Sequence, residues 1–263
     1  VPDVVPLHFL HGFFVVESRL LTVLLGIKLV AELCVLRVLG PPVVWTVHTL
    51  TEHENRHPRL EYALRHVVAR LCDRVIVHCD RAGDIITDTY RLPSRTQDRI
   101  RTVPHGNYNG VYPDEVSDEP ARAELNLTDE FVYLFFGQIR PYKEVDTLMK
   151  TFQRLNDPNV RLLIIGNPAN EELEARLASL AETDDRIRTV FEFVPGSKVQ
   201  YYHRAADVTV LPYHSILTSG SLILTMTFGR PAIAPNIGCV QELLDESGGF
   251  PYNPDREDVL FHT

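Results

Sequence analysis

Two cationic side chains stand close together in the segment F-G-Q-I-R-P-Y-K, where Arg140 and Lys143 follow a short apolar run. Lysine is rare in this chain, so a lysine in such a segment is conspicuous. A cation about 4 Å from a phosphate oxygen contributes roughly 4 kcal/mol at an effective dielectric constant of about 20, whereas an exposed ion pair contributes about 0–1 kcal/mol. The pair therefore predicts a diphosphate site, with ordinary surface charges as the alternative.

A second candidate is the turn of small residues T-S-G-S, which comprises Thr218, Ser219, Gly220 and Ser221 and precedes an apolar helical pattern at 222–228. Free backbone amides and the helix dipole favour an anion at a helix N-terminus, and small side chains permit its close approach. The turn is therefore predicted to cradle a phosphate. A plain helix cap with a flexible turn is the alternative.

The segment H-E-N-R-H at 53–57 has the form of the zinc-protease motif H-E-x-x-H. That motif needs a continuous helix that brings both histidines to one face, but Pro58 disfavours helical geometry at His57. The sequence instead predicts a helix that begins at Pro58 and runs to Cys72, and no metal site. The apolar residues of this helix are expected to form one buried stripe: Leu60, Ala63, Leu64, Val67, Val68 and Leu71.

These segments must be positioned by strands and helices that alternate along the whole chain, a pattern typical of parallel sheets covered by helices. Strands are expected at 3–9, 43–48, 74–78, 100–103, 131–137, 160–166, 187–193, 207–211 and 231–235. The predicted class is α/β, with two domains whose parallel sheets face each other across a cleft. Turn formers and acidic residues near 109–122 place an N-terminal domain at 1–113, a linker at 114–128 and a C-terminal domain at 129–263.

Composition argues against several kinds of partner. The chain has 26 Lys and Arg against 35 Asp and Glu, and this acidic balance argues against nucleic acid. The four cysteines are widely spread and include no C-x-x-C pair, which favours a reducing, cytoplasmic setting. Residues 20–39 are apolar, but Lys28, Glu32 and Arg37 interrupt them, so a buried helix is expected rather than a membrane span.

Four segments, taken in order, resemble glycosyltransferase family 4: F-G-Q-I-R-P-Y-K, L-L-I-I-G-N-P, F-E-F-V-P followed by R-A-A-D-V-T-V-L-P-Y, and F-G-R-P-A-I-A-P-N-I-G-C-V-Q-E. The similarity extends over most of residues 100–250 and implies two Rossmann-like domains of the GT-B fold. It also implies transfer of a hexose-type sugar from UDP or GDP to a glycan or lipid-linked acceptor, usually with retention and without a cofactor or metal ion. Family members have further segments at both ends, so a fragment or an abbreviated member is expected. Peripheral attachment to the inner face of a membrane is common in the family and stays open here.

The resemblance assigns the donor site residue by residue. Arg140 and Lys143 would neutralise the diphosphate, and the turn at 218–221 would hold phosphate or sugar hydroxyls. The other implied donor-site residues are Gly137 and Gly166, which would let the donor approach the strand ends, Phe193 and Val194, which would border the base, and Glu242, which matches a frequent family glutamate.

On the acceptor side, the resemblance places His48, at the end of the T-V-H strand, beside the transferred sugar as the catalytic-site residue. Weaker candidates for acceptor contacts are Glu52, His53, His105 and Gly106.

Three departures from the family pattern weaken the assignment. Gln138 stands where arginine is common, Glu144 stands where glycine follows the lysine, and Ile216 and Leu224 occupy two positions that are often glutamate. A nucleotide-sugar-binding protein without transferase activity and a sugar-nucleotide epimerase of the same fold are therefore kept as alternatives.

Overall fold

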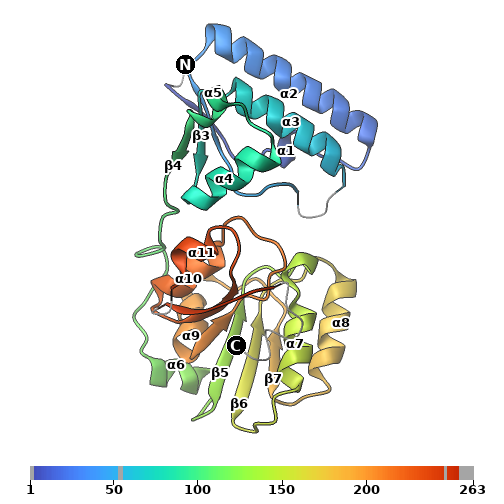
Figure 1. Cartoon of the computed structure of the whole chain (residues 1–263). Coiled ribbons are helices and arrows are strands. Elements are labelled where there is room, and N and C mark those ends of the chain that lie inside the picture. Colours follow the sequence, from blue (N-terminus) through green and yellow to red (C-terminus); the bar gives the residue numbers. More distant parts are fainter. Residues whose placement is uncertain (1–2, 53–55, 246–247, 255–263) are drawn as a thin grey trace. The chain divides into compact units, whose positions relative to one another are not determined.

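The computed structural model describes residues 3–52, 56–245 and 248–254. The chain divides into two compact units, Val1–His105 and Gly106–Thr263 (Figure 1). All nine predicted strands are present, with bounds within a few residues of those expected. The predicted linker at 114–128 contains a helix, α6 (Asp118–Glu124), that packs against α9 (Gly196–Ala205). The domain bounds themselves stay a prediction.

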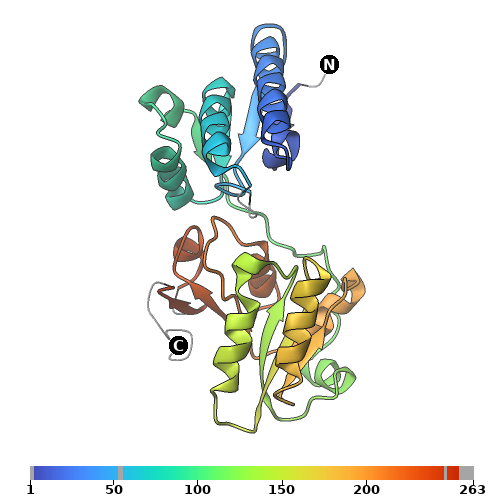
Figure 2. The same ribbon diagram turned by 90° about the vertical axis from the view of Figure 1, so that its right-hand side faces the viewer.

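The first unit holds a parallel sheet of strand order β1-β2-β3-β4. Its strands are β1 (Val5–Leu7), β2 (Val43–Thr46), β3 (Arg74–Val77) and β4 (Ile100–Thr102). Its helices are α1 (His11–Phe14), α2 (Arg19–Leu39), α3 (Pro58–Leu71), α4 (Asp80–Thr89) and α5 (Ser94–Gln97). Each strand pairs with the next one along the chain, so right-handed crossovers put α2, α3 and α4 on the same face of the sheet (Figure 2).

Two expectations about the first unit are wrong in part. The helix at 20–39 forms, but only a narrow side of it is buried, and Leu20, Val38 and Leu39 are 71%, 80% and 81% exposed. The helix after Pro58 also begins as predicted. Of the expected apolar stripe, Val68 is buried but Ala63 and Val67 are exposed, and the charged Glu61 and Arg65 are buried instead. The two helices pack against each other, with Leu64 of α3 against the bare backbone of Gly26.

The second unit holds a parallel sheet of strand order β10-β9-β8-β5-β6-β7. Its strands are β5 (Phe131–Phe136), β6 (Val160–Ile165), β7 (Ile187–Val190), β8 (Val208–Val210), β9 (Ala232–Pro235) and β10 (Gly249–Tyr252). Besides α6 and α9, its helices are the short 3-10 helix η1 (Pro141–Lys143), α7 (Val145–Gln153), α8 (Glu171–Ala181), α10 (Gly220–Thr227) and α11 (Val240–Leu243).

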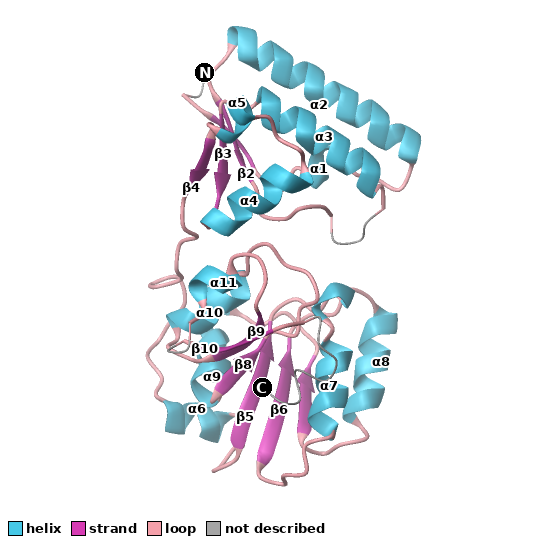
Figure 3. Cartoon of the chain, in the orientation of Figure 1, coloured by secondary structure: helices cyan, strands magenta, loops and turns pink. Residues whose placement is uncertain are grey.

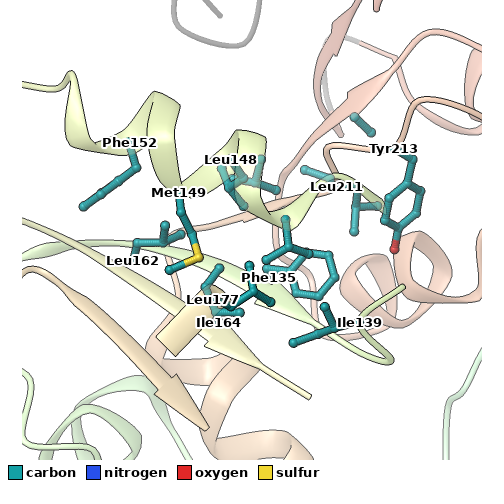
Figure 4. Close-up of a cluster of buried hydrophobic side chains, with 14 of the residues drawn as sticks. Phe135, Ile139, Leu148, Met149, Phe152, Leu162, Ile164, Leu177, Leu211 and Tyr213 are labelled. Carbon is teal, nitrogen blue, oxygen red and sulfur yellow. The ribbon is translucent and has the colours of Figure 1, made fainter. Parts of the chain in front are cut away.

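The sheet of the second unit is buried on both faces. In β6, Leu162 and Ile164 pack with residues of α7 and α8, whereas Leu163 and Ile165 pack with residues of α6 and α9. Figure 3 shows α7 and α8 on one side of the sheet and α6 and α9 on the other. This alternation follows from the two-residue period of a strand. Figure 4 shows the first of these clusters, in which Met149 of α7 lies over β6.

The order of the strands reverses at β5, which has β6 on one side and β8 on the other. Chain connections after β5 and after β8 therefore leave the carboxyl ends of these strands in opposite directions. Sheets of this kind bind ligands at such a switch point. The two loops that leave these strands carry the cationic pair and the small-residue turn.

Candidate functional site

Lys143, at the end of η1, is the centre of the donor-side geometry. Its side chain is 8% exposed, and its Nζ lies 5.8 Å from the centre of the Phe135 ring and 5.1 Å from that of Tyr213. Burial, followed by the neighbouring Arg140, lowers the pKa of Lys143 from 10.5 to about 8. The ammonium group of Lys143 has lost much of its hydration, so a nearby anion would stabilise its charged form strongly.

Arg140 lies half-buried at the start of the same turn. Its Nη1 donates a hydrogen bond to its neighbour Ile139 O at 3.0 Å, and its Nη2 donates to Gln138 Oε1 at 3.4 Å. The guanidinium therefore reaches back beside the side chain at position 138. The two predicted cations do lie close together, since the charge of Arg140 lowers the pKa of Lys143.

Two glycines bring the loops after β5 and β6 together. Gly137 and Gly166 have φ of +129° and +148°, which side chains rarely tolerate. A Cβ on Gly166 would lie 1.8 Å from the carbonyl oxygen of Gly137, and one on Gly137 would lie 3.2 Å from Ser221 Oγ and 3.8 Å from Lys143 Nζ. Gly137 thus lies between Lys143 and the small-residue turn. Because Gly137 has no side chain, the space between them stays open.

A cavity of about 300 Å³ opens beside these glycines. Four of the predicted donor-site residues line it: Gly137, Gly166, Phe193 and Val194. Phe193 is 82% exposed, so the cavity has a largely exposed apolar ring in its lining. The cavity has the aromatic and aliphatic lining that suits a flat base.

Tyr112 also lines this cavity, although the sequence analysis did not select it. Its ring lies 3.6 Å from where a Cβ on Gly196 would stand, at the start of α9. A bidentate salt bridge connects the segment that carries Tyr112 to α9. In it, Arg204 Nε donates to Asp114 Oδ1 at 2.7 Å and Arg204 Nη2 donates to Asp114 Oδ2 at 2.6 Å. The sequence offered one indication of this role, because Tyr112 is an aromatic residue in a segment of turn formers.

The small-residue turn forms the start of α10 as predicted. Ser219 is the N-cap, and its Oγ accepts a hydrogen bond from Leu222 N at 3.1 Å. Thr218, Gly220 and Ser221 are half-buried, and the hydroxyl of Tyr108 lies 3.0 Å from where a Cβ on Gly220 would stand. The turn therefore caps the helix, which was the alternative reading of these residues. Only the Ser219 side chain makes the cap, and the Ser221 hydroxyl lies beside Gly137.

Glu242 lies exposed on α11. The helix is tied to the loop after β8, because Cys239 N donates to Leu217 O at 2.9 Å and Gly238 packs against the carbonyls of Ile216 and Leu217. This contact brings α11 toward the small-residue turn. The role of Glu242 in donor binding stays a prediction.

On the first unit, His48 lies half-buried just beyond β2. His8, which follows β1, hydrogen-bonds to it, with 3.0 Å between His8 Nδ1 and His48 Nε2. The rings of His48 and His78 are 5.2 Å apart, and those of His78 and His105 are 5.1 Å apart. Each strand of the sheet therefore ends near a histidine, a pattern that the sequence analysis recognised only at His48 and His105.

The surroundings of His48 and His78 favour their neutral forms. Burial lowers the pKa of His48 from 6.5 to about 4, and His78, His8 and His105 add to the effect in that order. His78 Nδ1 donates to Val103 O at 3.0 Å, so its other ring nitrogen is an acceptor in the neutral form. Neutral imidazoles suit hydrogen bonds to hydroxyl groups rather than salt bridges.

The zinc-like segment does not form one helix. His57 lies just before α3, and its Nε2 is 3.1 Å from the carbonyl oxygens of both Val16 and Glu17. His53 lies outside the described residues. Across 3–52, 56–245 and 248–254, no group of three or more histidine, cysteine or acidic residues is arranged to hold a metal ion.

The sequence profile described as glycosyl transferases group 1 matches residues 130–261, and the profile described as glycosyltransferase family 4 matches residues 2–107. The chain belongs to the group 1 glycosyl transferases. The resemblance drawn from the ordered segments is thereby confirmed. The expected fold is confirmed as two parallel-sheet α/β domains of the GT-B type.

Known relatives of this group 1 glycosyl transferase span a longer chain. A GDP-mannose:glycolipid 4-beta-D-mannosyltransferase of Xanthomonas campestris pv. campestris is 32% identical over 200 residues, or 76% of this chain and 52% of that protein. A D-inositol 3-phosphate glycosyltransferase of Saccharomonospora viridis is 30% identical over 242 residues, or 83% of this chain and 55% of that protein. The chain thus spans about half the length of the curated relatives it matches.

Among solved structures, sucrose-phosphate synthase from Thermosynechococcus elongatus is similar, with a TM-score of 0.75 and 21% identity over 99% of this chain and 63% of that one. This likeness concerns the fold. No helix in the described part of this group 1 glycosyl transferase is long and apolar enough to cross a membrane.

The departures from the family pattern have structural explanations in two cases. Glu144 has φ of +47° and ψ of +41°, the left-handed conformation in which glycine is strain-free, which accounts for the glycine common there. Leu224 is 7% exposed and packs with Val199 and Phe228, so apolar packing occupies a position that is often glutamate. The partly buried Ile216 packs against the main apolar cluster in the same way.

Proposed function

We propose that this protein transfers a hexose-type sugar from a UDP- or GDP-linked donor to a glycan or lipid-linked acceptor. The name of the Xanthomonas relative favours GDP-mannose as the donor and a glycolipid as the acceptor. Family membership supports a transferase. The identity of the donor, the identity of the acceptor and the stereochemistry of transfer are proposed.

The single observation that carries the proposal is the buried Lys143 beside the open backbone of Gly137. A Cβ on Gly137 would approach both Lys143 Nζ and Ser221 Oγ, so a diphosphate in that space would meet a cation and a hydroxyl together. The free amides at the start of α10 would add hydrogen bonds to the same anion. The base would enter the 300 Å³ cavity on the other side of Gly137.

In this proposal the acceptor hydroxyl attacks the anomeric carbon of the donor while the bond from that carbon to the diphosphate breaks. The proton of the hydroxyl goes to the departing phosphate oxygen, and this attack on the face of the departing group would retain the configuration at the anomeric carbon. The β-linkage in the name of the Xanthomonas relative is the inverting alternative, which NMR of the product distinguishes. Lys143 and Arg140 stabilise the charge that grows on the diphosphate. Neutral His48 would hydrogen-bond a hydroxyl of the transferred sugar.

A binding and turnover panel tests the proposal. Isothermal titration with UDP, GDP, UDP-glucose and GDP-mannose should show millimolar or tighter binding to at least one of them, and the double variant R140M/K143M should weaken it. Unchanged affinity in the double variant contradicts the donor-site assignment. Turnover is then measured with octyl β-glucoside as an acceptor probe, and NMR of the product reads its anomeric configuration.

The same panel separates the alternatives. A nucleotide-sugar-binding protein would bind the donor without transfer to any of a range of acceptors. An epimerase would convert the free nucleotide sugar with no acceptor present. The departure at Ile216 and Leu224 motivates the binding-protein alternative, because apolar side chains occupy two positions that are often glutamate. The epimerase alternative is kept because it would share the fold. Peripheral membrane attachment is tested separately by sedimentation with anionic vesicles.

A further inference from the structure

A buried ion pair lies inside the first unit. Glu61 and Arg65 stand one turn apart on α3, with Arg65 Nη2 2.6 Å from Glu61 Oε1, and their side chains are 1% and 2% exposed. Such a pair is a poor source of stability, because the cost of removing both charges from water offsets much of their attraction. Apolar residues of similar volume would serve the fold about as well.

The pair is bonded instead to the backbone that follows His48. Arg65 Nη1 donates to Thr49 O at 2.6 Å, and Glu52 N donates to both carboxylate oxygens of Glu61, each at 2.9 Å. Between these two contacts, the hydroxyl of Tyr90 donates to Leu50 O at 2.7 Å.

The carboxylate of Glu52 is the group of this loop that could bind a ligand. It is 14% exposed, and its Oε1 lies 3.5 Å from Arg56 Nη1. Its Oε2 is buried and has no hydrogen-bond partner within the described part of the chain. A buried carboxylate oxygen without a donor calls for one from elsewhere, and a sugar hydroxyl supplies that donor.

We infer that Glu61, Arg65 and Tyr90 are positioning residues that hold the loop 49–52 so that Glu52 binds a hydroxyl of the acceptor. This inference rests on the proposed transferase function, because that function places the acceptor beside His48. It adds an acceptor-binding carboxylate and the buried network that aims it. The network fixes carbonyls and an amide of the loop on one side and leaves the Glu52 carboxylate to the ligand.

The most selective perturbation is Tyr90→Phe. It removes the hydroxyl that bonds Leu50 O but keeps the ring, whose centre lies 6.0 Å from that of Trp45. Tyr62→Phe is the matched control, because Tyr62 lies on α3 with its ring 6.2 Å from that of Tyr90 but is 36% exposed. Glu52→Gln tests the binding carboxylate itself.

Kinetics are measured with GDP-mannose as donor and octyl β-glucoside as acceptor probe. Y90F and E52Q should each raise the acceptor KM about 3- to 10-fold, the range expected for the loss of one hydrogen bond. The donor KM and donor hydrolysis without acceptor should stay at wild-type values, and Y62F should change none of these. A purely structural network would lower Tm in Y90F and leave the acceptor KM unchanged, and that result overturns the inference.

Amide hydrogen exchange provides a readout that needs no turnover. In Y90F and in Glu61→Gln, the amides of 49–52 should exchange faster than in the wild type while those in the second half of α3 keep their rates. Loss of protection spread evenly along α3 would also overturn the inference. Failure of the proposed function appears differently, as an absence of donor binding or turnover in the wild-type protein itself.

Discussion

Replacing Lys143 with methionine should weaken donor binding and stabilise the protein at the same time. The lysine is 8% exposed and lies over two aromatic rings, so its charge is costly to the folded protein and valuable to a bound diphosphate. Methionine keeps an unbranched apolar side chain in the same space but carries no charge. The two effects of one substitution therefore have opposite signs.

The magnitude follows from the pKa. Burial brings the pKa of Lys143 from 10.5 to about 8. A tenfold change in a proton equilibrium is about 1.4 kcal/mol, so holding the charge at neutral pH costs the folded state about 3 kcal/mol. Loss of the aromatic contacts offsets about 0.5–2 kcal/mol of the gain. A net stabilisation of about 1–2 kcal/mol remains, which raises Tm by roughly 3–6 °C.

The pH dependence has a definite sign. Between the folded pKa of about 8 and the unfolded value of 10.5, the unfolded chain binds more protons, so wild-type stability should rise with pH through this window. The stability difference between K143M and the wild type should therefore shrink from pH 7 to pH 10. Donor affinity of the wild type should fall as pH rises above about 8, because the lysine loses its proton.

Calorimetry at pH 7 and pH 10 measures stability, and isothermal titration with GDP-mannose and UDP-glucose measures donor binding, which should weaken about 10- to 100-fold. Lys150→Met is the matched control: it removes the same charge from α7, where the side chain is 62% exposed and lies 3.8 Å from Asp146. It should change neither quantity appreciably. A K143M protein that is less stable than the wild type, or that binds donor equally well, would refute the reasoning.

Three further outcomes are expected. Gly166→Ala should lower the free energy of unfolding by at least about 3 kcal/mol in chemical denaturation, because its Cβ would lie 1.8 Å from Gly137 O. Gly106→Ala is the control and should change that free energy by no more than about 0.5 kcal/mol, because no atom lies within 4 Å of its Cβ. Stability should fall as pH drops from about 6.5 toward about 4, since the unfolded His48 takes up a proton that the folded one refuses, and His48→Asn should flatten this slope in acid titration; an unchanged slope speaks against it. Phe193→Ala should weaken donor binding about 3- to 10-fold with Tm unchanged, because the ring is 82% exposed, and equal donor affinity would remove it from the site.

Much of the fold could be predicted from local pattern. The strand β6 reads as a continuous apolar run because it is buried on both faces, and the start of α3 follows from the proline at its first turn. The short strand β10 escaped prediction, since Gly249–Tyr252 contains both glycine and proline and has only neighbouring β9 to define it. The exposed side of α2 escaped as well, because an apolar sequence does not reveal how much of it other elements cover.

Part of the candidate donor site could also be predicted from the sequence. Gly137, Gly166, Phe193 and Val194 line one cavity, and they were selected because their segments follow strands in the order of a known family. Tyr112 was missed because it lies in a segment without periodicity, and only its packing at the start of α9 brings it to the cavity.

The sequence by itself determined the alternation of strands and helices, the turn that starts α10 and the presence of two cations after β5. These properties depend on neighbouring residues and on the periods of regular structure. Tertiary structure alone decided that Lys143 is buried between aromatic rings, that His8 meets His48 and that the charges of Glu61 and Arg65 hold a loop. Such properties depend on which distant segments the packing brings together, because burial and charge proximity set a pKa and sequence spacing does not.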